Sequence, residues 1–339
     1  MTDKPPPTPR VLSGIQPSGT LHLGNYFGAI RQHIALQDTY PDSALYFIAD
    51  YHALTTVRDP ELLRANVFDA AVTYLALGLD PGRAMLFRQS DVPEVTELAW
   101  MLASVTGMGL LERAHSYKDK LANGITPSVG LFFYPVLMAA DILAYDGTMV
   151  PVGKDQVQHI EMAQDMATHF NQAFCPDAPA LVRPEPLQAK AAVVPGFDGR
   201  KMSKSYHNTI PLFESGKALR KIVGQIVTDS TPLGEPLPFA TCNVAGILRL
   251  FCDEAELARL EGWYADGRRD GAPFGYGHAK LLLAEKIDQH FAAARVRRER
   301  LLSPEGRAEV ENILVRSAAR ARALAQQTLE RCRRACGLR

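Results

Sequence analysis

Short apolar runs alternate with longer helical patterns through the first half of the chain, and this alternation limits the possible folds. The runs expected to form strands are residues 11–15, 44–48, 84–87 and 148–152. The helical patterns between and after them cover residues 21–37, 60–77, 93–105, 127–145 and 155–171. Strands that alternate with helices of this length predict βαβ units and a parallel sheet. Ligands of such sheets bind at the carboxyl ends of the strands.

The second half of the chain has a different pattern. Residues 176–200 contain five prolines, and beyond residue 212 no strand pattern of comparable strength appears. The helices expected there cover residues 213–227, 244–252, 254–265, 278–300 and 305–336. The sequence therefore predicts the α/β fold class, with a Rossmann-like parallel-sheet domain and a smaller all-helical domain.

Charge gives little information about a partner when it is taken over the whole chain. The 339 residues carry 37 Lys and Arg against 37 Asp and Glu. Residues 291–339 are locally basic, because twelve Arg and no Lys stand against five Glu, a balance of +7. A basic helix there could contact RNA, but a solvated face or a subunit contact fits equally well.

The chain shows no targeting or membrane-spanning pattern. Its start, MTDKPPPTPR, lacks an apolar core, so residues 1–10 are expected to form a disordered tail. The longest apolar stretch, residues 129–140, is shorter than the roughly 20 residues that a membrane helix needs. Five cysteines without a C-x-x-C pair favour reduced thiols. We therefore expect a cytoplasmic protein without membrane contact.

The segment GIQPSGTLHLGN, residues 14–25, places a Gly- and Pro-rich turn between an expected strand and an expected helix. His22 and Asn25 lie three residues apart and share one face of that helix. Backbone N–H groups at such a turn and helix start favour an anion such as phosphate. Taken alone, the pattern is also compatible with an ordinary strand–helix loop.

A second motif, KMSKS at residues 201–205, follows the Gly-rich stretch GFDGR. Lys201 and Lys204 place two ammonium groups on one loop, and each is a strong point charge for phosphate oxygens. Taken alone, the motif is compatible with a basic surface loop. The G-x-x-x-x-G-K-[ST] and G-x-S-x-G motifs of other nucleotide-binding and hydrolytic sites are absent from the sequence.

An H-x-G-[HN] segment near the start of an α/β domain, paired with KMSKS near its end, resembles the signature of class I aminoacyl-tRNA synthetases. The details GIQPSGTLHLGNY, MAADIL and VPVGKDQ look like the bacterial tryptophanyl members of that family. The resemblance runs from about residue 11 to the C-terminus and is densest in residues 11–30, 130–171 and 196–206. It implies a ligase that activates L-tryptophan with MgATP to tryptophanyl-adenylate and pyrophosphate, and then transfers tryptophan to tRNA(Trp).

The resemblance also implies roles for individual residues. The catalytic residues would be His22, Asn25, Lys201 and Lys204. The ATP-binding residues would be Gln16, Ser18, Gly24, Asn25, Lys118, Gly153, Asp155, Lys201, Met202, Ser203 and Lys204. No resident metal site is implied, because Mg2+ arrives with ATP. The substrate carboxylate is itself the nucleophile, so the protein needs only to position the reacting groups and stabilise charge on the phosphates.

A pocket for the amino acid follows from spacing and from the same resemblance. Tyr134, Met138 and Asp141 lie at i, i+4 and i+7 and share one helix face. A buried carboxylate without a partner is costly, and an indole N–H would supply the partner of Asp141. Without those neighbours, a helix cap or a salt bridge is the alternative. The residues implied to bind tryptophan are Gln16, His52, Tyr134, Met138, Asp141, Val150, Val152 and Gln156.

The same family pattern implies a division into domains. Residues 11–195 would form the catalytic domain, and residues 196–303 would hold the KMSKS loop and a helical tRNA- and anticodon-binding domain. The C-terminal helix, residues 304–339, would pack back on the catalytic domain. A homodimer is the implied assembly.

Two positions depart from the family pattern and several alternatives stay open. Lys154 stands where an acidic residue is usual, and His207 stands where Gly is common. They leave open an auxiliary copy with an additional or altered role. A tyrosyl-tRNA synthetase, a synthetase-like binding protein and a small-molecule nucleotidyltransferase are further alternatives. MAADIL and GNY favour tryptophan over tyrosine, and the lysine motif with the helical C-terminal part disfavours the nucleotidyltransferase.

Overall fold

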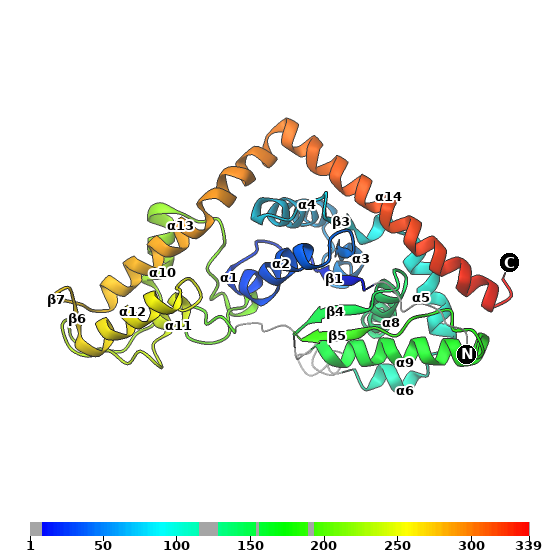
Figure 1. Cartoon of the computed structure of the whole chain (residues 1–339), viewed down its shortest axis with the longest axis horizontal. Helices are drawn as coiled ribbons and strands as arrows, with labels where there is room; N and C mark the ends of the chain where they lie inside the picture. The colour runs from blue at the N-terminus through cyan, green and yellow to red at the C-terminus, as the bar shows by residue number, and fades with distance from the viewer. Residues whose placement is uncertain (1–8, 115–127, 154–155, 189–192, 339) are drawn as a thin grey trace. The chain divides into compact units, whose positions relative to one another are not determined.

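The computed structural model describes residues 9–114, 128–153, 156–188 and 193–338. Their contacts divide the chain into two compact units, whose elements are labelled in Figure 1. Unit 1 comprises residues 1–19, 33–189 and 301–339, and unit 2 comprises residues 20–32 and 190–300. Each unit therefore combines segments that are far apart in the sequence.

Unit 1 is built on a parallel sheet. Its strands are β1 (Val11–Ile15), β2 (Ala44–Ile48), β3 (Ala84–Arg88), β4 (Met149–Val152) and β5 (Glu185–Gln188). Their order is β3-β2-β1-β4-β5, and every neighbouring pair runs parallel. The direction of strand progression reverses between β1 and β4. In a doubly wound sheet, ligands bind beyond the carboxyl ends of the strands at such a switch point.

Helices pack around this sheet. They are α2 (Arg31–Thr39), α3 (Asp50–Ala53), α4 (Pro60–Leu77), η2 (Gln89–Asp91), α5 (Glu94–Val105), α6 (Met108–Glu112), α8 (Val129–Leu143), α9 (Val157–Phe174) and α14 (Pro304–Ala335). Local sequence explains the bounds of α4. Asp59 caps its first turn by accepting from the N–H groups of Glu61 and Leu62. Gly78 ends the helix in the left-handed conformation, with φ at 111°.

The last helix, α14, packs against the edge strand β3 and against α5 (Figure 1). One face of α14 joins the main core of unit 1 through the buried residues Ala318, Ala321, Ala325, Leu329 and Cys332. These residues recur every three or four positions, which is the spacing of one helix face. The small side chains let the helix approach the strand closely, and the sheet edge is covered.

The helix predicted over residues 21–37 is interrupted by a π turn. The observed elements are α1 (Leu23–Asn25), the π turn η1 (Tyr26–Ile30) and α2. A π turn inserts one residue and so rotates the helix face that follows it. His33 and Gln37 are therefore buried, whereas Ile34, which the unbroken helical period places on the apolar face, is only half-buried. The boundary between the two units falls in this stretch.

The sequence predicts an all-helical second domain, and unit 2 is mostly helical but also contains a short β hairpin. Its elements are α1, η1, η4 (Lys204–Tyr206), α10 (Gly216–Gly224), α11 (Asn243–Leu248), α12 (Glu254–Asp266), α13 (Tyr276–Leu302) and a hairpin of β6 (Arg268–Arg269) and β7 (Ala272–Pro273). α12 begins with a capping box, in which Asp253 and Glu256 satisfy each other's backbone N–H groups.

An aromatic cluster attaches residues 20–32 to the rest of unit 2. The Tyr26 and Phe291 rings lie 5.0 Å apart edge to face, and so do the rings of Phe27 and Phe251. The Tyr26 hydroxyl lies 2.9 Å from His290 Nε2. Such edge-to-face pairs stabilise beyond the area that they bury. The contacts explain why a segment that follows β1 directly in the chain belongs to the helical unit, which differs from the predicted domain bounds.

The strand β5 has no counterpart in the sequence prediction. It lies in the proline-rich stretch and contains Pro186. Proline cannot donate to a sheet ladder and is tolerated mainly on edge strands. β5 is an edge strand, so it pairs with β4 alone. A proline-rich segment gives no alternating apolar pattern, and the strand is set by its partner.

Candidate active site

The segment from His22 to Asn25 begins the first helix of unit 2. The His22 backbone N–H donates to Asn25 Oδ1 at 3.1 Å, which closes the first turn. The Leu23 N–H donates to Ile210 O at 3.0 Å. Ile210 follows the KMSKS motif in the chain, so this bond joins the two predicted motifs within one unit.

The buried side chain of Asn208 supports residues 201–205, which we call the lysine loop. The amide nitrogen of Asn208 donates to Asp198 Oδ1 at 2.7 Å and to Lys201 O at 3.2 Å. The amide oxygen accepts from the Ser203 N–H at 2.8 Å. Asn208 is 0% exposed, whereas the Lys201 side chain is exposed. The backbone of the loop is therefore fixed by hydrogen bonds to a buried side chain, and the Lys201 ammonium group faces solvent.

Gly24 lies close to the lysine loop. A Cβ atom on Gly24 would lie 3.0 Å from His22 Cε1 and 3.4 Å from Met202 Cβ. Met202 is buried, with 4% of its surface exposed. The apolar residue between the two lysines therefore packs where the first motif lacks a side chain, and the two motifs approach each other at backbone distance.

The electrostatics of His22 suit a site for phosphate. Burial, and then the positive charge of Lys204, lower the pKa of His22 to about 4. The imidazole is therefore neutral at pH 7. Its Nδ1 atom is buried and makes no hydrogen bond to the part of the chain that the structure describes. Buried polar atoms are normally paired, so this nitrogen is available to a bound ligand.

His207 ends η4 in the left-handed conformation, with φ at 51° and ψ at 32°. This conformation explains why glycine is common at this position of the family pattern. A residue with a Cβ pays roughly 1–2 kcal/mol in the left-handed region. The substitution is therefore a local strain at the end of the lysine loop, and it removes no group from the loop.

A buried carboxylate cluster, composed of Asp141, Gln89 and His52, lies in unit 1. Asp141 is 1% exposed and projects from α8. Gln89 Nε2 donates to both carboxylate oxygens at 2.8 Å, and His52 Nε2 lies 2.9 Å from Oδ2. Burial raises the pKa of Asp141, and the hydrogen bonds from His52 and Gln89 act against this rise.

This cluster corrects the argument that leads from the sequence to Asp141. The expectation is that the carboxylate depends on an indole N–H for a partner. In the structure the carboxylate already accepts hydrogen bonds from two side chains of its own chain. An ionised carboxylate offers about four acceptor positions, so a further donor can still be accommodated. The assignment of Asp141 to the tryptophan pocket stays a prediction. The cost of an unpaired carboxylate is no support for it, because the carboxylate is already paired.

His52 and Tyr134 line one pocket of unit 1 with a volume of about 350 Å3, together with Tyr51, Leu54, Thr55, Arg58, Ser128, Gly130, Phe133 and Leu137. The volume is at the lower end of the range for small-molecule sites. Tyr134 Oη lies 2.6 Å from Nε2 of the buried His159, and burial raises the pKa of Tyr134 to about 12. Met138 and Asp141 do not line this pocket.

Other predicted residues lie at the carboxyl ends of the strands. Gln16 follows β1 and Gly153 follows β4, so both flank the switch point of the sheet. The Ser18 N–H donates to Gln16 O at 2.9 Å in the turn after β1. On β4, Val150 is buried and Val152 is half-buried, and Gln156 precedes α9. Lys118, Lys154 and Asp155 lie outside the described residues.

Residues 5–251 match the family model of the tRNA synthetases class I (W and Y). The chain belongs to this family. The predicted fold class and the predicted family are therefore both confirmed.

Similar proteins within this synthetase family are named for tryptophan. The tryptophan–tRNA ligase of Rhodopirellula baltica is 52% identical over 97% of this chain and 100% of its own length. That of Fusobacterium nucleatum is 48% identical over 97% of this chain and 98% of its own length. The structure of tryptophanyl-tRNA synthetase from Campylobacter jejuni, complexed with ADP and tryptophan, has 47% identity and a TM-score of 0.88. That match covers 97% of this chain and 99% of the other.

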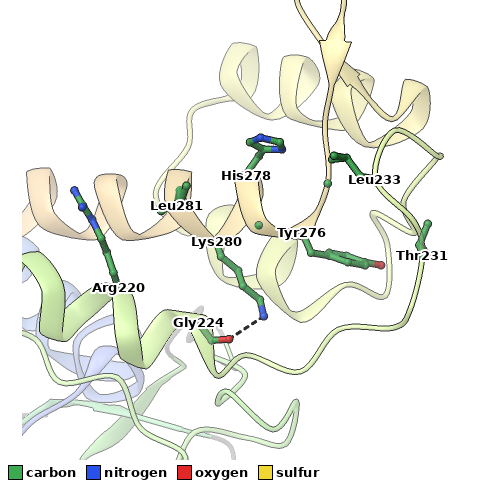
Figure 2. A pocket seen from close by; sticks show the side chains of 10 residues that line it. Arg220, Gly224, Thr231, Leu233, Tyr276, His278, Lys280 and Leu281 are labelled. Carbon is green, nitrogen blue, oxygen red and sulfur yellow. Dashed lines mark hydrogen bonds between the residues drawn. The ribbon is translucent and has the colours of Figure 1, made fainter.

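The helical unit of this synthetase contains a pocket of about 670 Å3. Figure 2 shows the basic side chains of Arg220, His278 and Lys280 around it, together with Leu233 and Leu281. Lys280 Nζ donates to Gly224 O at 2.9 Å. The Arg220 and His278 side chains are exposed. Cations beside apolar side chains are compatible with a nucleic-acid backbone and an unstacked base.

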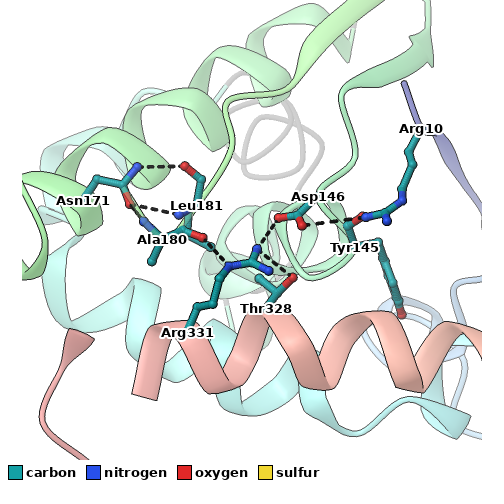
Figure 3. A network of polar contacts seen from close by, with 8 residues as sticks. All are labelled: Arg10, Tyr145, Asp146, Asn171, Ala180, Leu181, Thr328 and Arg331. Atoms are coloured by element: carbon teal, nitrogen blue, oxygen red, sulfur yellow. Dashed lines mark hydrogen bonds and ion pairs between the residues drawn. The ribbon is translucent and has the colours of Figure 1, made fainter. Parts of the chain in front are cut away.

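Arginines of α14 are paired within unit 1. Arg331 Nη2 donates to Asp146 Oδ1 at 2.6 Å, and Arg331 Nε donates to Ala180 O at 3.2 Å (Figure 3). Arg333 Nε donates to Glu97 Oε1 at 2.6 Å, and Arg322 Nη2 donates to Glu94 Oε1 at 2.9 Å. These bonds fix α14 to its own unit, so part of the local positive charge is compensated by neighbouring carboxylates.

Neither a metal cluster nor a spanning helix is found in the described ranges. Among those residues, no three His, Cys, Asp or Glu side chains are grouped so that they could hold a metal ion. No helix in the same ranges is both long and apolar enough to span a bilayer.

Proposed function

We propose that the chain is a tryptophan–tRNA ligase, which activates L-tryptophan with MgATP and transfers it to tRNA(Trp). Two findings support the proposal. Near-full-length relatives with 52% and 48% identity are tryptophan–tRNA ligases. In unit 2, a Cβ on Gly24 would lie 3.4 Å from Met202 Cβ, and the positive charge of Lys204 acts on the buried His22 imidazole, 182 positions away in the sequence, so the two motifs are close in space. This last observation carries the assignment to adenylate formation.

Adenylate formation needs little covalent chemistry from the protein. The tryptophan carboxylate attacks the α-phosphorus of ATP, and pyrophosphate leaves with the electron pair of the broken P–O bond. Lys201 and Lys204 would stabilise the charge that grows on the leaving phosphates. His22 is neutral, so it would bond phosphate oxygens as a hydrogen-bond donor, without a net charge of its own. Mg2+ would enter on the phosphates of ATP.

Specificity would be set in unit 1. Asp141 would accept the indole N–H, with His52 and Tyr134 beside the ring and the α-amino group. Val150 and Val152 would supply apolar walls, and Gln16 and Gln156 would hold the amino acid's polar groups. The support for this set is its place at the carboxyl ends of β1, β2 and β4 and on α8, where ligands of this fold class bind.

Transfer to tRNA would use the helical unit. Arg220, His278 and Lys280, around the pocket of that unit, are proposed to contact the anticodon arm. Residues 11–195 with the helix over 304–339 would be the catalytic domain, and residues 196–303 the tRNA-binding domain. The arginines of α14 that pair with Glu94, Glu97 and Asp146 would hold this helix in place.

A cytoplasmic homodimer is the assembly that we propose. Trp100 on α5 is 75% exposed, which is unusual for a tryptophan and is compatible with a subunit contact. Sedimentation velocity of the protein and of Trp100→Glu would test the dimer, and cell fractionation would test the location. A monomer at micromolar concentration would contradict the proposal.

The decisive experiment is ATP–pyrophosphate exchange measured with each of the twenty amino acids, followed by charging of tRNA. Exchange with tryptophan alone, together with charging of tRNA(Trp), is the expected result. Exchange with tyrosine would favour the tyrosyl alternative. Exchange with tryptophan but no charging of any tRNA would favour an auxiliary copy with another role.

A further inference from the structure

Gln89 is a buried side chain that sequence patterns do not single out. Gln89 begins η2 directly after β3 and is 1% exposed. Its amide nitrogen donates to Asp141 Oδ1 and to Oδ2, each at 2.8 Å. Its amide oxygen accepts from the Tyr51 N–H at 3.1 Å. Both ends of the amide are therefore paired, and the Tyr51 bond fixes which end faces the carboxylate.

Gln37 provides a contrast in the same unit. It is also buried, with 5% of its surface exposed, and both ends of its amide are also paired. However, its partners are backbone groups: it donates to Gly78 O at 3.0 Å and accepts from the Asp80 N–H at 2.8 Å. Gln37 thus ties two segments of backbone together, whereas Gln89 uses its donors on one ionisable side chain.

We propose that Gln89 is a positioning residue for tryptophan recognition, which holds the Asp141 carboxylate in one rotation and in the ionised state. The proposal rests on the proposed function, in which Asp141 accepts the indole N–H. One amide nitrogen that donates to both oxygens restricts rotation about the carboxylate axis. The remaining acceptor positions of Asp141 are thereby fixed in direction, and a substrate N–H can meet them without reorganisation.

The groups around Asp141 have opposite effects on its ionisation, so the hydrogen bonds from Gln89 influence its pKa. Burial and the negative charge of Asp50 favour the neutral carboxyl, whereas His52 and Gln89 favour the carboxylate. Tyr145 also interacts with Asp141, and its own pKa is raised far above the ordinary value, so its hydroxyl stays neutral. Gln89 is a donor that does not titrate. Its loss therefore raises the pKa of Asp141, and the acid limb of tryptophan use moves to higher pH.

The first test replaces Gln89 with methionine, which keeps the volume and removes both hydrogen bonds to the carboxylate. Gln89→Met is expected to raise the KM for tryptophan at least tenfold, to leave the KM for ATP within twofold, and to shift the acid limb of kcat/KM upward in pH. Gln37→Met is the matched control, because it also removes a buried amide. It is expected to lower thermal stability without moving the pH limb or the KM for tryptophan.

A second variant keeps the test open if the methionine protein does not fold. Gln89→Glu places a second carboxyl group against Asp141, and two adjacent carboxyls share one proton. Near pH 5 the shared proton restores a donor, whereas near pH 8 the two charges repel. The KM for tryptophan is therefore expected to rise with pH in Gln89→Glu, a trend that the unsubstituted protein lacks.

Two results would overturn the inference. One is a folded Gln89→Met protein with an unchanged KM for tryptophan and an unmoved acid limb. The other is a Gln89→Glu protein whose KM does not depend on pH. Both results leave the proposed function standing if the unsubstituted protein exchanges pyrophosphate with tryptophan. Absence of that exchange contradicts the proposed function itself.

Discussion

The lysine loop in unit 2 and the carboxylate cluster in unit 1 both hold charge for the proposed reaction, but they hold it in different ways. The Lys201 side chain is exposed, and its backbone carbonyl accepts from the buried Asn208. Asp141 is 1% exposed, and its own charged atoms are bound by Gln89 and His52. At Lys201 the supporting residue, Asn208, is buried and the charge faces solvent, whereas at Asp141 the charge itself is buried.

This difference follows from the cost of desolvation. An exposed ammonium keeps its hydration, so the loop needs no partner for Lys201 before a phosphate arrives. A buried carboxylate without donors would be costly or would become protonated. The chain therefore supplies donors for Asp141 in advance. We infer that the cations that would meet growing charge on phosphate lie on a loop whose backbone is held by a buried residue. The carboxylate that would select the substrate lies in the core.

The largest effect is expected at the lysine loop. Lys204→Ala should raise the activation free energy of adenylate formation by about 3 kcal/mol, because a cation aimed at charge in the transition state is lost. The KM for tryptophan should change little. Lys217→Ala is the control, because Lys217 is an exposed lysine of the same unit in α10. Steady-state exchange kinetics measure both values, and an unchanged kcat with a raised tryptophan KM would refute the prediction.

The next effect tests the buried charge. Asp141→Asn keeps the size and one acceptor oxygen but loses the charge. The fall in kcat/KM for tryptophan should therefore correspond to about 2 kcal/mol. A tryptophan analogue with sulfur in place of the indole N–H should be rejected by the unsubstituted protein and much less so by Asp141→Asn. Competition kinetics between tryptophan and the analogue measure this ratio. Equal activation of the two by the unsubstituted protein would remove Asp141 from indole recognition.

A smaller effect is expected from the strain at the end of the lysine loop. His207→Gly relieves the left-handed conformation but gives the unfolded chain more freedom, so a net gain of about 0.5 kcal/mol is expected. Asp270 is the matched control, because its φ of 50° is nearly the same and it lies in the β6–β7 hairpin. Asp270→Gly should change stability alone, whereas His207→Gly should also change the KM for ATP. Urea unfolding and exchange kinetics separate these outcomes, and a loss of stability in His207→Gly would count against the strain.

The smallest effect on tRNA charging is expected from α14. Neutralising Arg331, Arg333 and Arg334 together should leave charging within a fewfold of the original rate. Arg331 and Arg333 are bound to Asp146 and Glu97 and are not free for phosphate. Thermal stability should fall, because these pairs hold α14 to unit 1. A large loss of charging with intact adenylate formation would instead make this helix a site for RNA.

Sequence patterns find those parts of the site that depend on local order. The segments around His22 and Lys204 are short motifs, and the strands before Gln16 and Gly153 are short runs in which apolar residues predominate. Such features are encoded within about a dozen neighbouring residues, so periodicity and motif spacing indicate them.

The groups that support the site are not visible in the same way. Gln89 and Asn208 each stand within a short polar stretch, and their roles arise from partners 52 and 5 positions away. Nothing in their own neighbourhood distinguishes them from surface residues. The π turn at Tyr26–Ile30 is also hidden, because one inserted residue changes a helix face without changing the local composition.

The discontinuity of both units has a consequence for the synthesis of the chain on the ribosome. Residues 20–32 leave the ribosome early, but the aromatic partners of Tyr26 and Phe27 in unit 2 lie at Phe251 and Phe291. The core of unit 1 is likewise complete only after the buried face of α14 has been made, and this helix begins at Pro304. A nascent chain therefore exposes incomplete apolar surfaces until the residues of α14 have been translated. A truncation that removes this face of α14 would leave those surfaces uncovered, so it is expected to raise the demand for chaperones and also to lower final stability.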